Sequence, residues 1–169
     1  SVALIYDNRG QLLSQEYFDK YEKRCNSKNG YSKETKVYDE YGMISEVSYL
    51  DALDKPIESD RLAFKTVYAY DHYGRIVSKQ HLNANGKLTW QQSPHNEGIK
   101  ECWIEYEYDK FGNVTKTTYK DPIGKATDFA GWATCLKQYD ELSREIEIRY
   151  YNSLNQPIGG QFKYPLEKY

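Results

Sequence analysis

Short segments of alternating apolar and polar residues precede Tyr-Asp dipeptides along the chain. Before Asp109 the alternation separates two sets of side chains, Glu101, Glu105 and Glu107 on one side and Cys102, Ile104, Tyr106 and Tyr108 on the other. A period of two is typical of a β-strand with one buried face and one solvated face. The sequence therefore predicts strands in these segments, and the glutamates on the wet side.

The Tyr-Asp dipeptides recur at intervals of 32, 32, 38 and 31 residues, which indicates a tandem repeat. Gly follows the Asp by three residues in four copies, and Ser143 takes that place in the fifth. Asp at the first position of a turn accepts backbone hydrogen bonds, and Gly at the fourth adopts positive φ without steric cost. The residues that we assign to these structural turns are Asp7, Gly10, Asp39, Gly42, Asp71, Gly74, Asp109, Gly112 and Asp140.

A second turn is expected 12 residues after each of these aspartates, where every copy has Asp or Asn. The second-turn residues are Asp19, Asp51, Asn83, Asp121 and Asn152. Three residues further, four copies have a residue that tolerates a left-handed backbone, and Glu22 is the exception. The eight residues 43–50 between two turns would span about 27 Å at the rise of a strand, so we expect one strand there.

Each unit is thus predicted to contain a strand, a tight turn, a second strand, another tight turn and a looser return. We expect an all-β fold of tandem β-hairpin repeats that form an extended antiparallel meander or β-solenoid-like sheet. The chain 1–169 is interpreted as a single repeat array from a longer protein, with approximate units 3–35, 36–67, 68–104, 105–136 and 137–169. The longest insertion, 90–96, is expected to be an exposed loop, and 161–165 a partial strand. Open sheet edges favour edge-to-edge self-association.

Three first-turn sequences resemble those of bacterial YD-repeat proteins of the RHS type. They are Tyr38-Asp39-Glu40-Tyr41-Gly42, Tyr70-Asp71-His72-Tyr73-Gly74-Arg75 and Tyr108-Asp109-Lys110-Phe111-Gly112-Asn113. The second turn Asp121-Pro122-Ile123-Gly124-Lys125 is similar to a looser set of uncharacterised bacterial surface repeats, and the unit is longer than the usual YD period. The resemblance implies a β-repeat architecture and a secreted, periplasmic or cell-surface location in bacteria. It implies no catalytic residue.

The composition and net charge argue against some kinds of partner, such as nucleic acids and membranes. The net charge is −2 and no strongly basic stretch occurs, which argues against nucleic-acid binding. No apolar run approaches 18 residues, so we expect no membrane span. The 18 tyrosines suit half-buried strand positions, where the ring packs and the hydroxyl reaches water.

Residues with catalytic or ligand-binding chemistry do not form a recognisable motif. The histidines, His72, His81 and His95, show no metal-ligand spacing with cysteine. The turn aspartates are explained by the turns themselves, because each turn offers too few carboxylates for the oxygen ligands that calcium requires. No GxSxG, P-loop or GxGxxG element occurs. We therefore expect a protein that is not an enzyme and has no cofactor or metal.

Aromatic residues offer two interpretations. A Tyr or His stands two residues before each second turn, at Tyr17, Tyr49, His81, Tyr119 and Tyr150. The simpler interpretation is a packed ladder between neighbouring copies; the other is a row of platforms for sugar rings or choline-like cations. Weak ligand-binding candidates are Trp90, Trp103 and Trp132. The leading hypothesis is a non-catalytic scaffold that binds a protein or glycan partner, and the alternative is a glycan- or choline-binding cell-wall module.

The three cysteines, Cys25, Cys102 and Cys135, are too few for a disulfide framework. Cys102 and Cys135 stand at similar places in adjacent copies, so they could pair if equivalent strands approached each other. In a meander an intervening strand would separate them by at least about 10 Å, which is too far for a disulfide. We therefore expect three free thiols.

Overall fold

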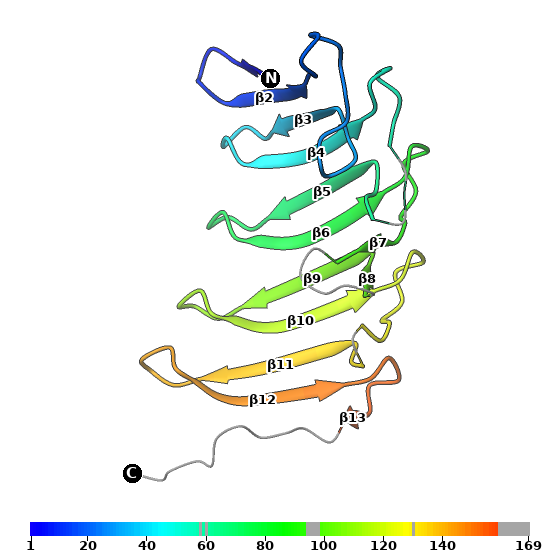
Figure 1. Ribbon diagram of the computed structural model, residues 1–169. Coiled ribbons are helices and arrows are strands. Elements are labelled where there is room, and N and C mark those ends of the chain that lie inside the picture. Colours follow the sequence, from blue (N-terminus) through cyan, green and yellow to red (C-terminus); the bar gives the residue numbers. More distant parts are fainter. Residues whose placement is uncertain (58, 60, 94–98, 130, 159–169) are drawn as a thin grey trace.

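The computed structural model describes residues 1–57, 59, 61–93, 99–129 and 131–158 (Figure 1). Within these ranges every helix or strand is a β-strand, so the predicted all-β fold is confirmed. The segment 161–165, expected to be a partial strand, lies outside the described residues. The strands are β1 (Val2–Tyr6), β2 (Leu12–Tyr17), β3 (Lys33–Tyr38), β4 (Ile44–Leu50), β5 (Lys65–Tyr70), β6 (Ile76–Leu82), β7 (Gln91–Gln92), β8 (Lys100–Glu101), β9 (Trp103–Tyr108), β10 (Val114–Lys120), β11 (Thr134–Tyr139), β12 (Glu145–Tyr151) and β13 (Pro157–Ile158).

Eleven of these strands form one open antiparallel sheet in the order β1-β2-β3-β4-β5-β6-β9-β10-β11-β12-β13. Chain order equals spatial order, apart from β7 and β8, which pair with each other in a small separate sheet. The sheet is the predicted meander and not a closed barrel. The first turns lie in a row at one end of the strands, at the left of Figure 1, and the second turns lie in a row at the other end. We call these two rows the first-turn edge and the second-turn edge.

The first turns are closed by the aspartate side chain. Asp71 Oδ1 accepts hydrogen bonds from the N–H groups of Tyr73 and Arg75 at 2.9 and 3.0 Å. The φ angles of Gly42, Gly74 and Gly112 are 84°, 77° and 93°, in the left-handed region where a Cβ is strained. A register shift accompanies each first turn, as between Ala69 and Tyr70, which is the bulge expected of this type of hairpin.

The second turns repeat the same hydrogen bonds with either Asp or Asn. Asn83 Oδ1 accepts from the N–H groups of Asn85 and Lys87, both at 3.0 Å. Glu22, expected to be the exception, has a φ of 60° and adopts the left-handed conformation as well. The Asp19 side chain accepts from Tyr21 and Lys23, and so holds the turn against the cost of the non-glycine residue.

The sheet has two unlike faces. One, which we call the tyrosine face, carries among others Tyr17, Tyr38, Tyr49, Tyr68, Tyr70, Tyr106, Tyr108, Tyr119, Tyr139 and Tyr150. The opposite face carries cross-strand ion pairs, which are Lys33–Glu16 at 2.8 Å, Lys65–Glu46 at 2.5 Å and Lys120–Glu105 at 2.7 Å. The alternation read from the sequence therefore separates an aromatic face from a charged face along most strands.

The returns between second turns and the following strands supply much of the core. The buried apolar residues include Tyr31, Ala63, Phe129 and Ala133, all from returns. The segment 90–96 was expected to be an exposed loop; of its described residues, 90–93, Trp90 is exposed, but the prediction is wrong for Gln91 and Ser93. Gln91 and Ser93 are buried, and Gln91 belongs to β7, which pairs with β8. There the Gln91 side-chain carbonyl accepts the Ala63 N–H at 3.0 Å.

Candidate functional site

The tyrosine of each Tyr-Asp dipeptide ties its unit to the unit before it. Tyr38, Tyr70, Tyr108 and Tyr139 donate hydroxyl hydrogen bonds to main-chain carbonyls at 2.9, 2.7, 2.7 and 3.0 Å. The acceptors are Leu12, Ile44, Ile76 and Val114, each two residues after the preceding first turn. The spacing of the dipeptide revealed the repeat, but the role of its tyrosine in joining units was not predicted from the sequence.

The column of residues before the second turns is part of an interleaved ladder on the tyrosine face. Residues from the returns insert between its members. Tyr31 lies between Tyr17 and Tyr49, with ring centroids 5.8 and 4.8 Å away. Trp132 likewise lies between Tyr119 and Tyr150, at 5.0 and 5.3 Å. The inserted residues occupy equivalent positions in the repeat. The N–H groups of Tyr17 and Tyr119 donate to the carbonyls of Ser32 and Ala133, and Tyr31 and Trp132 directly precede these acceptors.

A polar group interrupts this ladder in the middle of the sheet. His81 replaces tyrosine in the column, and Glu101 occupies the inserted position where Tyr31 and Trp132 stand in other units. Its Oε1 lies 3.1 Å from His81 Nε2 and accepts from Lys79 Nζ at 2.5 Å. On the other side of the ring, Thr66 Oγ1 lies 3.0 Å from His81 Nδ1.

The alternation in the sequence placed Glu101 on the wet side, and this is wrong. The chain bends at Cys102, between β8 and β9, so Glu101 leaves the strand pattern and lies against the tyrosine face. Glu105 and Glu107, within β9, do lie on the charged face, where they pair with Lys120 and Lys116.

The polar group is satisfied internally. Because a carboxylate only accepts, His81 Nε2 donates to Glu101, and the Thr66 hydroxyl donates to Nδ1. Burial lowers the pKa of His81, and the ring is neutral. Burial raises the pKa of Glu101, but hydrogen bonds from His81 and Lys79 outweigh it, and the net shift is downward. With His81 and Glu101 only 1% and 4% exposed, the group supports the packing between units.

The edges of the sheet expose apolar side chains in regular rows. On the first-turn edge the third turn position holds Tyr41, Tyr73, Phe111 and Leu142, and Tyr41 is 84% exposed. On the second-turn edge the equivalent residues are Tyr21, Leu53, Ile123 and Leu154. Neighbouring members of the first-turn row are two strands apart, which corresponds to about 10 Å, whereas the second-turn row is interrupted by Asn85 in the third unit. The first-turn row is therefore a regular series of exposed apolar side chains.

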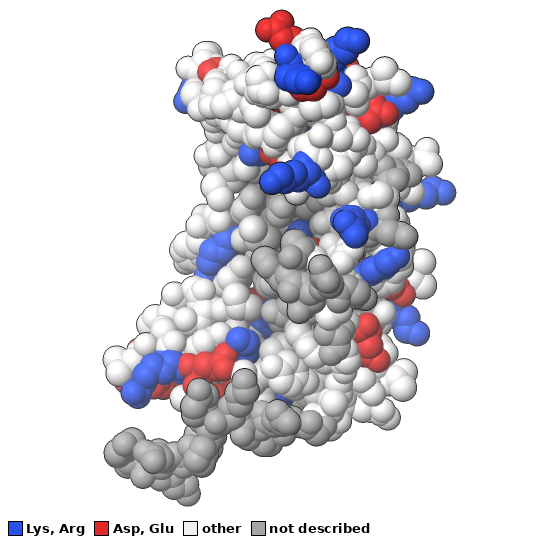
Figure 2. All heavy atoms as spheres, in the orientation of Figure 1, with Lys and Arg blue, Asp and Glu red and all other residues white. Residues whose placement is uncertain are grey.

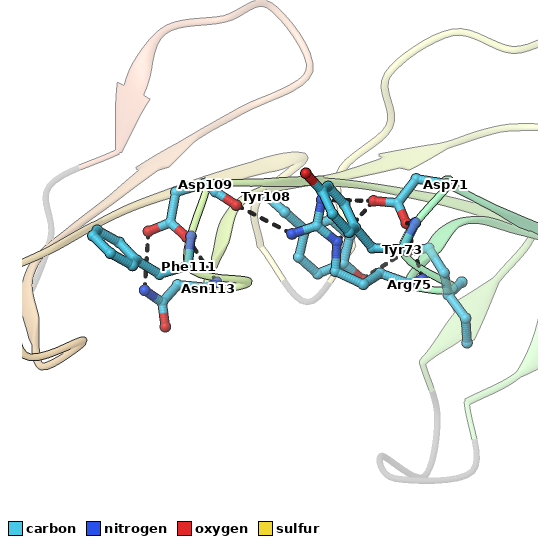
Figure 3. A network of polar contacts seen from close by, with 8 residues as sticks. Asp71, Tyr73, Arg75, Tyr108, Asp109, Phe111 and Asn113 are labelled. Carbon is cyan, nitrogen blue, oxygen red and sulfur yellow. Dashed lines mark hydrogen bonds and ion pairs between the residues drawn. The ribbon is translucent and has the colours of Figure 1, made fainter.

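A clamp around Arg75 joins two first turns (Figure 3). The Nε and Nη2 groups of Arg75 each donate to Asp71 Oδ2 at 2.7 Å. Nη1 donates to the main-chain carbonyl of Asp109, in the next turn, at 3.1 Å. The guanidinium also lies over the rings of Tyr73 and Tyr108, 4.8 and 4.5 Å from their centroids. Partial desolvation raises the pKa of Asp71, but the bonds from Arg75 leave it below its ordinary value.

One unit earlier, Met43 stands in the place of Arg75, and a hollow with a volume of about 350 Å³ lies between the two turns. The hollow is lined by Asp39, Tyr41, Met43, Tyr70, Asp71, His72 and Gly74. Asp39 Oδ1 is used by its own turn, accepting from Tyr41 and Met43 at 3.0 and 2.8 Å. Within the described ranges no donor to Asp39 Oδ2 is found. This site was not predicted from the sequence; its signal was the varying residue after each turn glycine, where a donor side chain gives way to Met43.

The three tryptophans named as weak ligand candidates come from different elements and contact different residues. Trp103 lies on the charged face, beneath the Lys120 ammonium at 4.3 Å, and its Nε1 donates to Ser78. Trp132 is part of the ladder. Trp90 lies in the return after β6 and is 37% exposed. The structure does not gather them into one aromatic platform.

The remaining chemistry is sparse. The three cysteines are free, as expected, and Cys102 and Cys135 are buried. Burial raises the pKa of Cys102 to about 11. Among the described residues no group of three His, Cys, Asp or Glu is placed to hold a metal ion, and no helix is long and apolar enough to cross a membrane. On the face seen in Figure 2, basic and acidic side chains are scattered in small groups among uncharged ones.

No known protein family and no curated protein sequence matches the chain. Its fold is similar to that of a chain in the Photorhabdus luminescens Tc holotoxin pore with a TccC3 mutation. The TM-score is 0.57 and the identity 17%, over 91% of this chain and 7% of the other. A chain of the TcdB2-TccC3-TEV crystal structure gives a TM-score of 0.45 at 17% identity, over 85% of this chain and 8% of the other. The similarity to the pore chain is one of fold, and the chain spans less than a tenth of the length of either.

Proposed function

We propose that this chain is a non-catalytic repeat scaffold that binds a protein partner along its first-turn edge, as part of a bacterial secreted or cell-surface protein. The observation that carries the proposal is the row of Tyr41, Tyr73, Phe111 and Leu142, held at equal spacing on a continuous sheet. Aromatic anchors of this kind contribute much of the energy in protein interfaces.

Three further features support a scaffold. Each unit is joined to the next by strand pairing and a tyrosine hydrogen bond, so the row is presented on a rigid support. The buried polar group of His81 and Glu101 makes its hydrogen bonds to other residues of the sheet and supports the packing between units. The fold similarity to a chain of the Tc holotoxin pore, which is a toxin assembly, agrees with a role in protein assembly.

Site-specific photo-crosslinking tests the proposal. A p-benzoylphenylalanine in place of Leu142 samples the first-turn edge, and the same residue in place of Glu107 samples the charged face as a control. We expect position 142 to crosslink a discrete protein from the secreted and envelope fractions of the source bacterium. The yield should fall at least about tenfold when Phe111→Ser removes a neighbouring anchor.

Equal yields at positions 142 and 107, or yields insensitive to Phe111→Ser, would contradict the edge as the contact surface. The glycan- or choline-binding alternative is tested in parallel by tryptophan fluorescence during titration with cell-wall sugars and with choline. A saturable change that Trp90→Ala abolishes would favour that alternative instead.

A further inference from the structure

We propose that the hollow between the turns 39–42 and 71–74 binds the guanidinium group of an arginine side chain presented by the partner protein. This proposal rests on the proposed function, because it assigns the partner one chemical group. It follows from a comparison within the repeat. The equivalent space between the next two first turns, 71–74 and 109–112, is occupied by the guanidinium of Arg75, and we call each of these spaces a slot.

Each group that surrounds the Arg75 guanidinium has an identical counterpart in the hollow. The carboxylate of Asp71 corresponds to that of Asp39. The ring of Tyr73 corresponds to Tyr41, and the ring of Tyr108 to Tyr70. The carbonyl of Asp109, which accepts Nη1, corresponds to the carbonyl of Asp71. The four counterparts are Asp39, Tyr41, Tyr70 and Asp71, and each of these residues lines the hollow.

The difference between the two slots is the residue after the turn glycine. Gln11, Arg75 and Asn113 at this position each donate a hydrogen bond to the next turn, at 3.3, 3.1 and 3.1 Å. The thioether of Met43 has no hydrogen to donate, and a Cβ built on Gly74 would lie 3.7 Å from its Cε. Met43 therefore lines the hollow with an adaptable apolar side chain and leaves the Asp39 and Asp71 acceptors to a ligand.

The acceptors favour guanidinium over other cations. Asp39 Oδ2 accepts nothing from the described part of the chain, so a cation meets one unpaired carboxylate oxygen. The Asp71 carbonyl accepts from Gly74, just as the Asp109 carbonyl accepts from Gly112 while also binding Arg75. A guanidinium can donate to both acceptors while its plane lies on the rings. A quaternary ammonium such as choline has no hydrogen to donate and would use the rings alone.

The test exploits the fact that Met43 is the chain's single methionine. Protein labelled with ¹³C at the methionine methyl gives one reporter signal, from a residue that lines the hollow. We titrate it with N-acetyl-arginine amide, with its neutral isostere N-acetyl-citrulline amide, and with choline. We expect a saturable shift with arginine at on the order of millimolar affinity, and binding at least about fivefold weaker for citrulline and for choline.

Variants taken from other units keep the fold while changing the slot. Asp39→Asn removes the charge but keeps the turn, since Asn83 holds the same type of turn. Tyr41→Leu removes one aromatic face, since Leu142 stands at that position in the fifth unit. Both should weaken arginine binding at least about fivefold. Asp140→Asn is the matched control, because it makes the same change in a turn remote from the hollow, and it should leave the shift unchanged.

No saturable shift with arginine would overturn the proposal, as would equal binding of citrulline or choline. If Asp39→Asn does not fold, judged by its amide spectrum, Tyr41→Leu decides the matter. Insensitivity of arginine binding to whichever of these variants folds also overturns it. The outcome is distinguishable from that of the proposed function, because crosslinking at position 142 does not require the hollow. A partner captured there with no arginine effect at Met43 would retain the scaffold and discard the guanidinium site.

Discussion

The tyrosine hydroxyl bonds between units make a sharp prediction for Tyr70→Phe. Tyr70 donates to the Ile44 carbonyl at 2.7 Å, and both residues are half-buried. Burial raises the pKa of Tyr70, so the hydroxyl remains a donor at neutral pH. Removing it deletes one hydrogen bond with almost no change in packing, which typically costs about 1 kcal/mol. For a chain of this length we expect the melting temperature to fall by about 2–4 °C.

A control with the same change in the same motif is available in Tyr6→Phe. Tyr6 also precedes a turn aspartate, but its hydroxyl donates to no described residue, because no strand of the structure lies beyond β1. This variant should stay within about 0.5 kcal/mol of the wild type. Urea unfolding followed by tryptophan fluorescence measures both. Equal effects of the two substitutions, or no effect of Tyr70→Phe, would refute the claim that the hydroxyl joins the units.

Three further predictions concern backbone strain and pH. Gly74→Val should destabilise by more than about 1 kcal/mol in thermal unfolding, because φ is 77° there; an unchanged midpoint would contradict the turn assignment. Glu22→Gly should stabilise by about 0.5 kcal/mol, because relief of the left-handed strain at φ 60° exceeds the entropic cost of glycine; Glu22→Ala, the control, should not stabilise. The folded pKa values of His81 and Glu101 lie below their ordinary values of 6.5 and 4.5, so the unfolded chain binds more protons as the pH falls through this window. The free energy of unfolding should therefore decrease on acidification from pH 7 to pH 4, and His81→Gln should flatten the upper part of that decrease; equal slopes in both proteins would show that His81 is not involved.

Features set by local chemistry could be predicted from the sequence. The turns follow from the Asp or Asn side chain at the first position, which bonds to backbone a few residues away, and five copies repeat the evidence. The sheet follows from the strand lengths between these turns. The turn at Glu22 forms although this residue type fits the left-handed conformation poorly, since the closing hydrogen bonds of Asp19 outweigh that poor fit.

Features that depend on contacts between units were mostly missed. The acceptor of Tyr70 is Ile44, 26 residues away, and nothing near Tyr70 in the sequence points to it. Glu101 was misplaced because a bend at Cys102 ends the alternation that the segment otherwise follows. The residues that surround the Arg75 guanidinium come from two different first turns. For Tyr70 and Arg75 the available signal was a fixed position relative to the turn residues of each copy, and its meaning required the spatial order of the strands.

The polar pair of His81 and Glu101, which we call the polar step in the aromatic ladder, favours the correct register between similar units. Tandem copies with alike strands can in principle pair one unit out of step, and aromatic ladder positions would tolerate the slip. Glu101 would not, because a slip replaces His81 by a tyrosine such as Tyr49 and leaves a buried carboxylate without its partner. Removing the hydrogen-bond donor of a buried carboxylate costs about 1–3 kcal/mol, a large share of the stability of an ordinary domain. The longest interval of the repeat, 38 residues, is the one that supplies Gln91 and Glu101, so the irregular return and the polar step together mark the centre of an otherwise uniform sheet.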